Sequence, residues 1–211
     1  MPRNRNKKTS RFVARVKTLE EESKKSKTKK AKTWSLRPEV LAGPNIPSPM
    51  HGVAPRVVLG KVWWDNERKE SYKKTSYHCI ACGVNKYKAK ARKWLEGHEL
   101  YDVDYRKGTM TYVETIPLCH YCHNYIHDGR LTWLLRSGKV SHGKYAGILQ
   151  HGDKVLAEAG LRRPTRRQRE EAIAELIIKG EVAEWDDWRL IVHGKKYPPI
   201  KTYEEWKSQN V

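Results

Sequence analysis

The sequence contains few of the residues that build a large apolar core. Phenylalanine occurs once in 211 residues, and only 38% of the residues are hydrophobic. Eight tryptophans and eleven tyrosines supply much of the core-forming material instead. The length is enough for one domain with extensions or for two small domains. This composition favours a core that covers only part of the chain.

Long apolar runs are absent as well. No segment approaches the roughly 18–20 apolar residues that a membrane-spanning helix needs. The first residues carry Lys and Arg without the apolar stretch of a secretory signal. We therefore expect a cytoplasmic protein that is neither secreted nor bound to a membrane. In such a reducing compartment, paired cysteines bind metal more often than they form disulfides.

Acidic residues are too few to balance the basic ones. The chain has 43 Lys and Arg against 24 Asp and Glu, which gives a net charge of +19. Residues 1–37 alone carry fourteen Lys or Arg and three Glu, or 14 − 3 = +11. This excess favours a polyanionic partner, with nucleic acid as the first candidate. A solvated basic surface or a ribosome-associated protein would show a similar balance, so charge alone does not identify the function.

Composition divides the chain into four segments. Residues 1–42 are expected to form a basic, largely disordered arm that orders on a phosphate backbone. Residues 43–76 combine a linker rich in Pro and Gly with a lead-in helix whose tryptophans pack on the next segment. Residues 77–140 form the compact core. Residues 141–211 form a helical and aromatic C-terminal extension that is a candidate for DNA binding.

Local patterns predict the main elements. Residues 92–105 and 109–118 read as two strands joined by a turn at Lys107-Gly108. A helix is expected from about residue 122 to residue 136, and another from Pro164 to Lys179. The C-terminal helix either contacts DNA through its basic end or packs on the domain for stability, and the sequence leaves both alternatives open.

Four cysteines form two C-x-x-C pairs. Cys79 and Cys82 are separated by 36 residues from Cys119 and Cys122. Each pair supplies two ligands at a spacing suited to tetrahedral zinc, and two pairs complete the coordination shell. The sequence therefore predicts a structural zinc site with no open coordination position.

The stretch LCHYCHNYIH, residues 118–127, allows two other interpretations. C-x-x-C-H is also the pattern of covalent haem attachment, but that use would require export and would leave the first cysteine pair without a role. A single Cys2His2 site lacks the dozen residues that separate cysteines from histidines in a zinc finger. With the thiols assigned to zinc, His123 and His127 share a helix face and can bind a second ion. His120 is expected to be exposed.

A third group lies upstream, where His98 and Glu99 are adjacent on the first expected strand. Adjacent strand residues point to opposite faces, so only one of the two can face the histidine pair unless a bulge intervenes. Asp102 and Asp104 follow on the same strand. They either orient an imidazole, join a metal shell or simply flank the turn.

The ordered motifs C-x-x-C, LEGHE and LC-x-x-CH-x-x-x-H resemble the HNH endonuclease family, in its zinc-stapled branch with a ββα-metal active site. The resemblance covers about residues 77–131, and WWDNERKESY before them is similar to the family's lead-in. It implies an α+β fold with a small, zinc-stapled, treble-clef-like core between helical and extended basic N- and C-terminal extensions. It also implies a homing-type or phage-type enzyme that hydrolyses DNA phosphodiesters, by nicking or by double-strand cutting.

The resemblance implies roles for individual residues. One divalent ion, often Mg²⁺, binds the scissile phosphate, and His123 and His127 match the helix residues that hold it. The strand motif offers His98 and Glu99. Register with the family places His98 in the ligand slot and Glu99 in the base slot. Chemistry favours His98 as general base and Glu99 as oxygen ligand or support. The catalytic candidates are therefore His98, Glu99 and His123.

The family's central Asn is missing, since Glu114 or Thr115 stands in its place. This departure keeps a second function open, a non-catalytic zinc-knuckle protein that binds RNA, a ribosome or other nucleic acid. The expected partners are double-stranded DNA, Zn²⁺, Mg²⁺ or another divalent ion, and a second copy of the chain if both strands are cut. The arginines expected to contact nucleic acid follow the last histidine or begin the C-terminal helix: Arg130, Arg136, Arg162, Arg163, Arg166 and Arg167.

Overall fold

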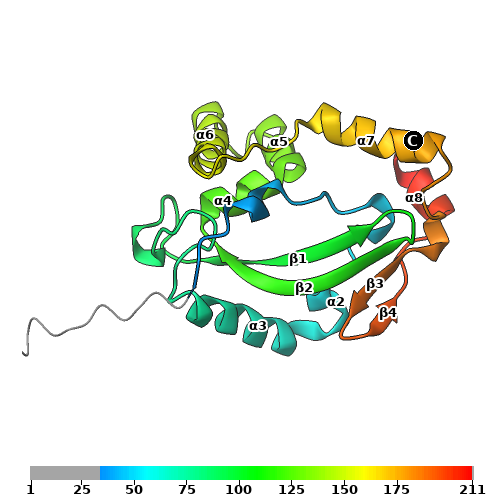
Figure 1. Cartoon of the computed structure of the whole chain (residues 1–211), viewed down its shortest axis with the longest axis horizontal. Coiled ribbons are helices and arrows are strands. Elements are labelled where there is room, and N and C mark those ends of the chain that lie inside the picture. Colours follow the sequence, from blue (N-terminus) through cyan, green and yellow to red (C-terminus); the bar gives the residue numbers. More distant parts are fainter. Residues whose placement is uncertain (1–33, 211) are drawn as a thin grey trace, which may run out of the picture. The chain divides into compact units, whose positions relative to one another are not determined.

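The computed structural model describes residues 34–210, in which helices surround a small four-stranded sheet (Figure 1). Residues 1–33, most of the expected basic arm, and Val211 lie outside the described residues. In chain order, with η for a 3-10 helix, the elements are η1 (Pro38–Ala42), η2 (Ser48–Met50), α2 (Pro55–Val58), α3 (Gly60–Lys74), η3 (Lys86–Lys88), β1 (Glu96–Asp104), β2 (Thr109–Leu118), α4 (His120–Ile126), α5 (Asp128–Arg136), α6 (His142–Glu158), α7 (Arg166–Ile178), η4 (Trp185–Asp187), β3 (Arg189–Val192), β4 (Lys195–Tyr197) and α8 (Tyr203–Asn210).

The sheet has the order β1-β2-β3-β4. The antiparallel hairpin of β1 and β2 confirms the prediction from the sequence, and its register shifts once, between Leu100 and Tyr101. Gly108 at the turn has φ +63, and a Cβ there would lie 2.7 Å from the side chain of Ala183, so the position requires glycine. The C-terminal extension adds β3 parallel to β2 and β4 antiparallel to β3. These two strands were not predicted.

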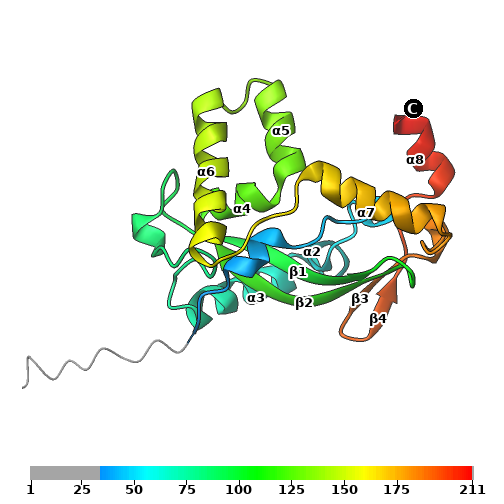
Figure 2. The ribbon, with the colours of Figure 1, turned by 45° about the horizontal axis from the view of Figure 1, so that its top comes forward.

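Helices cover both faces of the hairpin, with α3 on one side and α4 on the other (Figures 1 and 2). The expected lead-in helix is α3, and its tryptophans pack on the strands as predicted. The ring of Trp64 lies 3.0 Å from the position that a Cβ of Gly97 would occupy, so the helix approaches β1 closely. Trp63 meets Tyr112 of β2 edge-on, with ring centroids 5.6 Å apart.

Residues 34–54 lie along the domain, and we call them the strap. Val40 and Leu41 are buried in a core around the four cysteines. Met50 and Val53 are buried in a second core with Trp188. The linker rich in Pro and Gly is therefore packed on the domain through Met50 and Val53. Residues 34–42, in contrast, do not belong to a disordered arm, because their apolar side chains complete the first core.

The helix expected over residues 122–136 is two helices that meet at His127. This residue has φ −85 and ψ 53, outside the helical region, and it ends α4 and precedes α5. The break turns the chain directly at a predicted metal ligand. Its cause is a set of contacts from distant residues, described below, which no local pattern indicates.

Residues 141–211 were expected to form a helical and aromatic extension, and the structure shows that they also contribute to the core. Helix α6 was not predicted, yet it buries Ile148 and Leu156. Helix α7 was expected, and it begins with a capping box formed by Thr165 and Gln168. No residue of α7 is fully buried, but its Arg169 is paired with Asp128 of α5, which attaches the helix to the domain.

We predict that Gly152→Ala destabilises the fold. A Cβ at Gly152 of α6 would lie 2.1 Å from Cδ2 of Tyr125, because α6 and α4 meet at this point. Overpacking of this kind costs about 1–3 kcal/mol. Gly147→Ala in the same helix is the matched control, since its Cβ would meet only Tyr121 at 3.9 Å. Thermal unfolding followed by circular dichroism should show a lower Tm for Gly152→Ala alone, and an equal Tm for both variants would contradict the packing.

Candidate metal centres

The four cysteines come together as predicted. The Sγ atoms of Cys79, Cys82, Cys119 and Cys122 lie within 4.8 Å of one another, and none forms a disulfide. The sulfurs of Cys82 and Cys119 are 3.8 Å apart. Tetrahedral zinc with bonds of about 2.3 Å places neighbouring sulfurs roughly 3.8 Å apart. The cluster therefore fits one zinc ion with all four positions filled by protein.

The backbone around the cysteines explains the geometry. The first pair forms a knuckle in which the amide of Gly83 donates to the carbonyl of Cys79 and the amide of Cys79 donates to that of Val84. Gly83 has φ +73, which favours glycine. The amide of Ile80 donates to the carbonyl of Pro117 on β2, so the knuckle is attached to the strand that leads into the second pair. Cys119 then caps the start of α4.

His151 of α6 is a neighbour of this cluster that the sequence did not reveal. Its Nε2 lies 3.3 Å from Sγ of Cys122. Hydrogen bonds to the sulfurs of Cys119 and Cys82 raise the pKa of His151 to about 9. The protonated ring can offset part of the negative charge of four thiolates. No sequence signal marked it, since it lies 29 residues beyond Cys122 in a helix that was not predicted.

Three histidines form a second cluster. Nitrogens of His98, His123 and His127 lie within 4.8 Å of one another. The rings of His123 and His127 are 4.7 Å apart between centroids, and that of His98 is 4.9 Å from that of His127. Nδ1 of His98 is buried and has no hydrogen-bond partner among the described residues. A buried imidazole nitrogen without a partner fits a metal ligand or a base that receives a proton.

The surroundings of His98 and His127 favour the neutral form of both rings. Burial, followed by the charges of His127 and His123, holds the pKa of His98 well below its ordinary value. Burial and the nearby charges of His123 and Arg130 lower the pKa of His127 to about 4. Neutral imidazoles keep the lone pairs that a metal ion or a proton requires. The cluster is therefore ready for either use near neutral pH.

Glu96 contacts two histidines of α4, which the sequence did not indicate. Its Oε1 lies 2.7 Å from Nδ1 of His120, and its Oε2 lies 2.7 Å from Nδ1 of His123. Burial would raise the pKa of Glu96, but the hydrogen bond with His120 and the close imidazole of His123 hold it well below its ordinary value. Metal-binding histidines commonly donate their second N–H to a carboxylate in this way. His120 was expected to be exposed, and it is instead buried against Glu96 and Asn124.

Glu99 lies apart from the histidine cluster. It is buried, and it accepts a hydrogen bond from Arg56. The only register shift of the hairpin follows Leu100, so Glu99 and His98 keep the opposite orientations of adjacent strand residues. The geometry therefore does not favour Glu99 as a direct ligand or as a base. The charge of Arg56 also lowers the pKa of His98 and His127, so the guanidinium lies near the cluster.

The other acidic candidates have structural roles or are exposed. Asp104 accepts hydrogen bonds from the amides of Arg106 and Lys107 in the hairpin turn. Asp102 is exposed on β1. Glu114, where the family has Asn, is paired with Arg37 of the strap. Thr115 is buried and bonded to Tyr112.

Arg163 was expected to contact nucleic acid, but the structure contradicts this prediction because its side chain is buried. Its guanidinium donates to the carbonyls of Tyr125 and Ile126 at 2.6 and 3.0 Å, and it lies over the ring of Tyr125. Carbonyls at a helix end lack partners within the helix, so Arg163 caps α4 just before His127. It also lies 3.6 Å from Asp128, which is paired with Arg169. These contacts hold the break between α4 and α5, and they keep Arg163 away from solvent.

The remaining predicted arginines are accessible. Arg130, Arg136 and Arg162 are exposed. Arg166 and Arg167 are exposed on α7, where each pairs with a glutamate one turn later. Five of the six arginines are therefore exposed, and their contact with nucleic acid stays a prediction.

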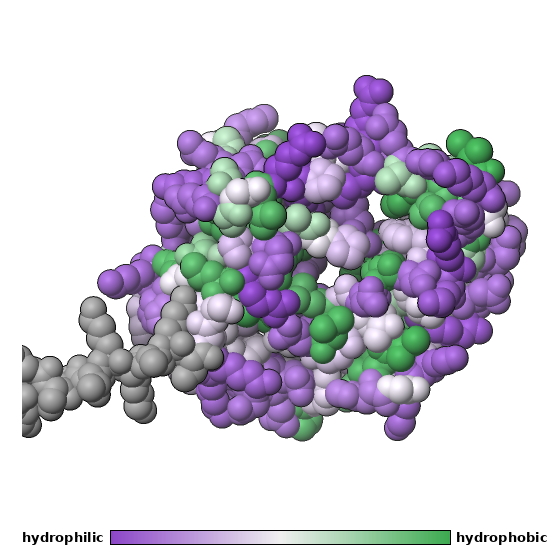
Figure 3. Space-filling view, viewed as in Figure 1, coloured by the Kyte–Doolittle hydropathy of each residue, from purple (hydrophilic) through white to green (hydrophobic). Residues whose placement is uncertain are grey.

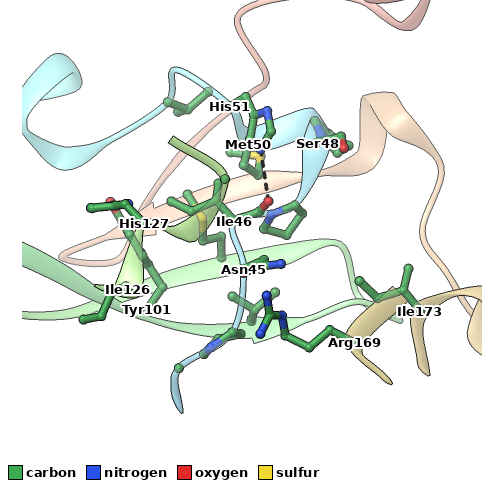
Figure 4. A pocket seen from close by; sticks show the side chains of 18 of the residues that line it. Asn45, Ile46, Ser48, Met50, His51, Tyr101, Ile126, His127, Arg169 and Ile173 are labelled. Atoms are coloured by element: carbon green, nitrogen blue, oxygen red, sulfur yellow. Dashed lines mark hydrogen bonds between the residues drawn. The ribbon is translucent and has the colours of Figure 1, made fainter. Parts of the chain in front are cut away.

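The histidines open into a groove of about 2240 Å³ between the hairpin and α7. The strap crosses it, so that Asn45 and Ile46 lie between His127 and Arg169 (Figure 4). The ring of His51 bonds to the carbonyl of Ile46 and holds the strap's bend. In the space-filling view the molecule is hollowed here, and both hydrophobic and hydrophilic residues border the hollows (Figure 3).

A comparison of the chain with protein families, with curated proteins and with solved structures finds no match. Among residues 34–210, no helix is both long and apolar enough to cross a membrane.

We predict that Cys119→Ser abolishes zinc binding and lowers stability. The substitution removes one of four thiolates and leaves the start of α4 without its attachment to the knuckle. Elemental analysis of the purified chain should give about one zinc per wild-type chain and much less for the variant. Thr132→Ser on α5 serves as the control, because Thr132 does not belong to the cysteine cluster. Equal zinc content in all three proteins would contradict the site.

Glu96→Gln should weaken binding of a divalent ion at the histidines. An amide presents one acceptor in place of two, so it no longer accepts from both His120 and His123. Loss of such a partner typically costs about 10–100-fold in metal affinity. Titration with Mn²⁺, read by calorimetry, measures the effect, and Asp102→Asn on the same strand is the control because Asp102 is exposed. Unchanged Mn²⁺ affinity in Glu96→Gln would remove Glu96 from the site.

Proposed function

We propose that the protein is a metal-dependent DNA endonuclease of the HNH type. The observation that carries this proposal is the cluster of His98, His123 and His127, whose nitrogens lie within 4.8 Å of one another. They come from the first strand of a hairpin and from the end of the following helix, in the order strand, strand, helix that a ββα-metal site requires. The helix begins inside the cysteine cluster, as in a treble-clef-like zinc core.

The proposal gives each histidine a role. His123 and His127 hold the divalent ion, Mg²⁺ or a similar cation, and Glu96 orients His123. His98 is the general base, and it accepts a proton from water at its unpartnered Nδ1. When bound, the ion would supply positive charge that stabilises the phosphate transition state and the leaving oxygen. Glu99 holds Arg56 beside the site and is not itself a ligand.

The charged surroundings suit a phosphate backbone. Arg130 and Arg56 both contribute to the low pKa of His127, so two cationic side chains lie near the proposed ion. The net charge of +19 favours double-stranded DNA as the partner. With one active site per chain, cutting both strands requires a homodimer or two successive nicks. A homing or phage role agrees with a small enzyme that has basic extensions.

A second function, a zinc-knuckle protein that binds nucleic acid without cutting it, is favoured by two observations. Glu99 is paired with Arg56. Of the two residues that can stand in place of the family's Asn, Glu114 is paired with Arg37 and Thr115 is bonded to Tyr112. Neither acid therefore replaces the missing group at the histidines. This alternative explains the cysteine cluster and the charge, but it gives the unpartnered His98 no role.

Plasmid nicking tests the proposal. Wild-type protein with Mg²⁺ or Mn²⁺ should convert supercoiled DNA to the nicked form. His98→Ala should lose about 10²–10⁴-fold in rate if it is the base, while its Mn²⁺ affinity stays near wild type. His123→Ala should lose both rate and Mn²⁺ affinity. His142→Ala is the matched control, since His142 is exposed at the start of α6.

The same measurements separate the alternatives. If His98→Ala loses Mn²⁺ affinity as well as rate, His98 is a third ligand and the base lies elsewhere. If wild type and His98→Ala are equally inactive on supercoiled, linear and branched DNA with both metals, the endonuclease proposal is wrong and the non-cutting function remains.

A further inference from the structure

A second surface, distant in sequence from the arginines considered above, combines basic and aromatic side chains. It is the loop between α3 and β1, at the left of Figure 1. No Asp or Glu occurs between Glu70 and Glu96. This interval holds seven cations, Lys73, Lys74, Lys86, Lys88, Lys90, Arg92 and Lys93. Such a run without acids gives the loop a strong positive potential.

Aromatic rings lie among these cations and face solvent. Trp94 is 53% exposed, Tyr87 is 68% exposed and Tyr77 is 39% exposed. Nζ of Lys86 lies 4.2 Å from the ring centroid of Tyr77 and 4.7 Å from that of Tyr87. The guanidinium of Arg92 lies 5.2 Å from the ring centroid of Trp94. Cations and rings therefore alternate across the surface, which we call the knuckle-loop patch.

The patch contains a small cleft. Its volume is about 270 Å³, just below the roughly 300 Å³ at which drug-sized pockets begin. The lining side chains are basic, aromatic or aliphatic, namely Arg68, Tyr72, Tyr77, Lys86, Trp94 and Leu95. None of them lines the groove at the histidines. The cleft is thus a separate site, of a size suited to one planar base.

The loop holds these rings in fixed positions. The amide of Lys86 donates to the carbonyl of Tyr77, and the side chain of Asn85 accepts from the amide of Tyr87. Ala89 is buried in the core around the cysteines. Because the loop is anchored, the exposure of its rings is a property of the folded surface. Packing within the domain does not explain why three large rings remain in solvent.

We propose that the knuckle-loop patch binds an unpaired nucleic-acid strand. A base stacks in the cleft between Tyr77 and Trp94, and the lysines contact the adjoining phosphates. Stacking on aromatic rings beside a basic track is the usual way in which proteins hold single strands. In a duplex the faces of the bases are covered by their neighbours, so the patch favours single-stranded or unpaired segments. The inference rests on the nucleic-acid partner of the proposed function, but not on its chemistry.

The test compares two tryptophans of equal exposure in the full-length protein. Trp94→Ala removes the proposed stacking ring. Trp133→Ala is the matched control, since Trp133 on α5 is 54% exposed and has Lys139 4.3 Å from its ring centroid. Binding of a fluorescent thymidine 20-mer and of a hairpin duplex is measured by anisotropy without added divalent ion. Trp94→Ala should bind the single strand about 10-fold more weakly, and it should bind the duplex nearly as well as wild type.

Two further measurements are the salt dependence of single-strand binding and competition by polyglutamate. Lys88→Ala with Lys90→Ala should flatten the slope of log affinity against log salt for the single strand by about 0.7 per lost phosphate contact. Polyglutamate should compete poorly. The inference is overturned if Trp94→Ala and Trp133→Ala bind the 20-mer with equal affinity. It is also overturned if polyglutamate displaces the 20-mer as effectively as unlabelled single-stranded DNA does, because the patch would then fit an acidic protein. The binding assay needs no cleavage. If the wild-type protein never nicks DNA, but Trp94→Ala still weakens binding of the single strand, the endonuclease proposal is wrong and the binding patch is supported.

Discussion

The convergence of four thiols is the constraint on which the rest of the structure depends. It joins a knuckle after α3 to the junction between β2 and α4, and both C-x-x-C pairs lie in one buried core with residues of the strap and α6. Helix α4 has only seven residues, and isolated helices shorter than about 12 residues are marginal in water. Its position therefore comes from its ends, from the cysteines at its start and from Arg163 at its finish.

Charge is distributed according to burial in this strongly basic chain. Three carboxylates near the histidines are each paired with a cation or an imidazole: Glu96 with two histidines, Glu99 with Arg56 and Asp128 with Arg169. A buried charge is costly unless it is paired and hydrogen-bonded. All three pairs surround the histidine cluster. The site thus keeps His98 and His127 neutral at its centre. The ion pairs lie at its edge, where they fix the strand, the helix end and Arg56.

The parts that could be predicted from the sequence are those with local patterns. The two C-x-x-C pairs, the hairpin and the capped α7 each depend on spacing or on residues a few positions apart, and the i,i+4 pair His123 and His127 does as well. The parts that were missed depend on distant partners. No sequence pattern near Cys122 indicates its contact with His151. Similarly, no pattern near Arg163 indicates that its guanidinium caps a helix 37 residues earlier. Strand β3 is short, and it becomes a strand only by pairing beside β2.

The helix break at His127 shows why such distant contacts matter for function. A continuous helix would leave the carbonyls of Tyr125 and Ile126 bonded within it and would carry His127 onward along a straight axis. Arg163 instead takes both carbonyls, and Asp128 begins a new helix while bonded to Arg169. The chain can then turn at His127 and keep its ring 4.9 Å from that of His98. The C-terminal extension therefore shapes the histidine cluster itself, so a core of residues 77–140 alone would lack the contacts that place His127.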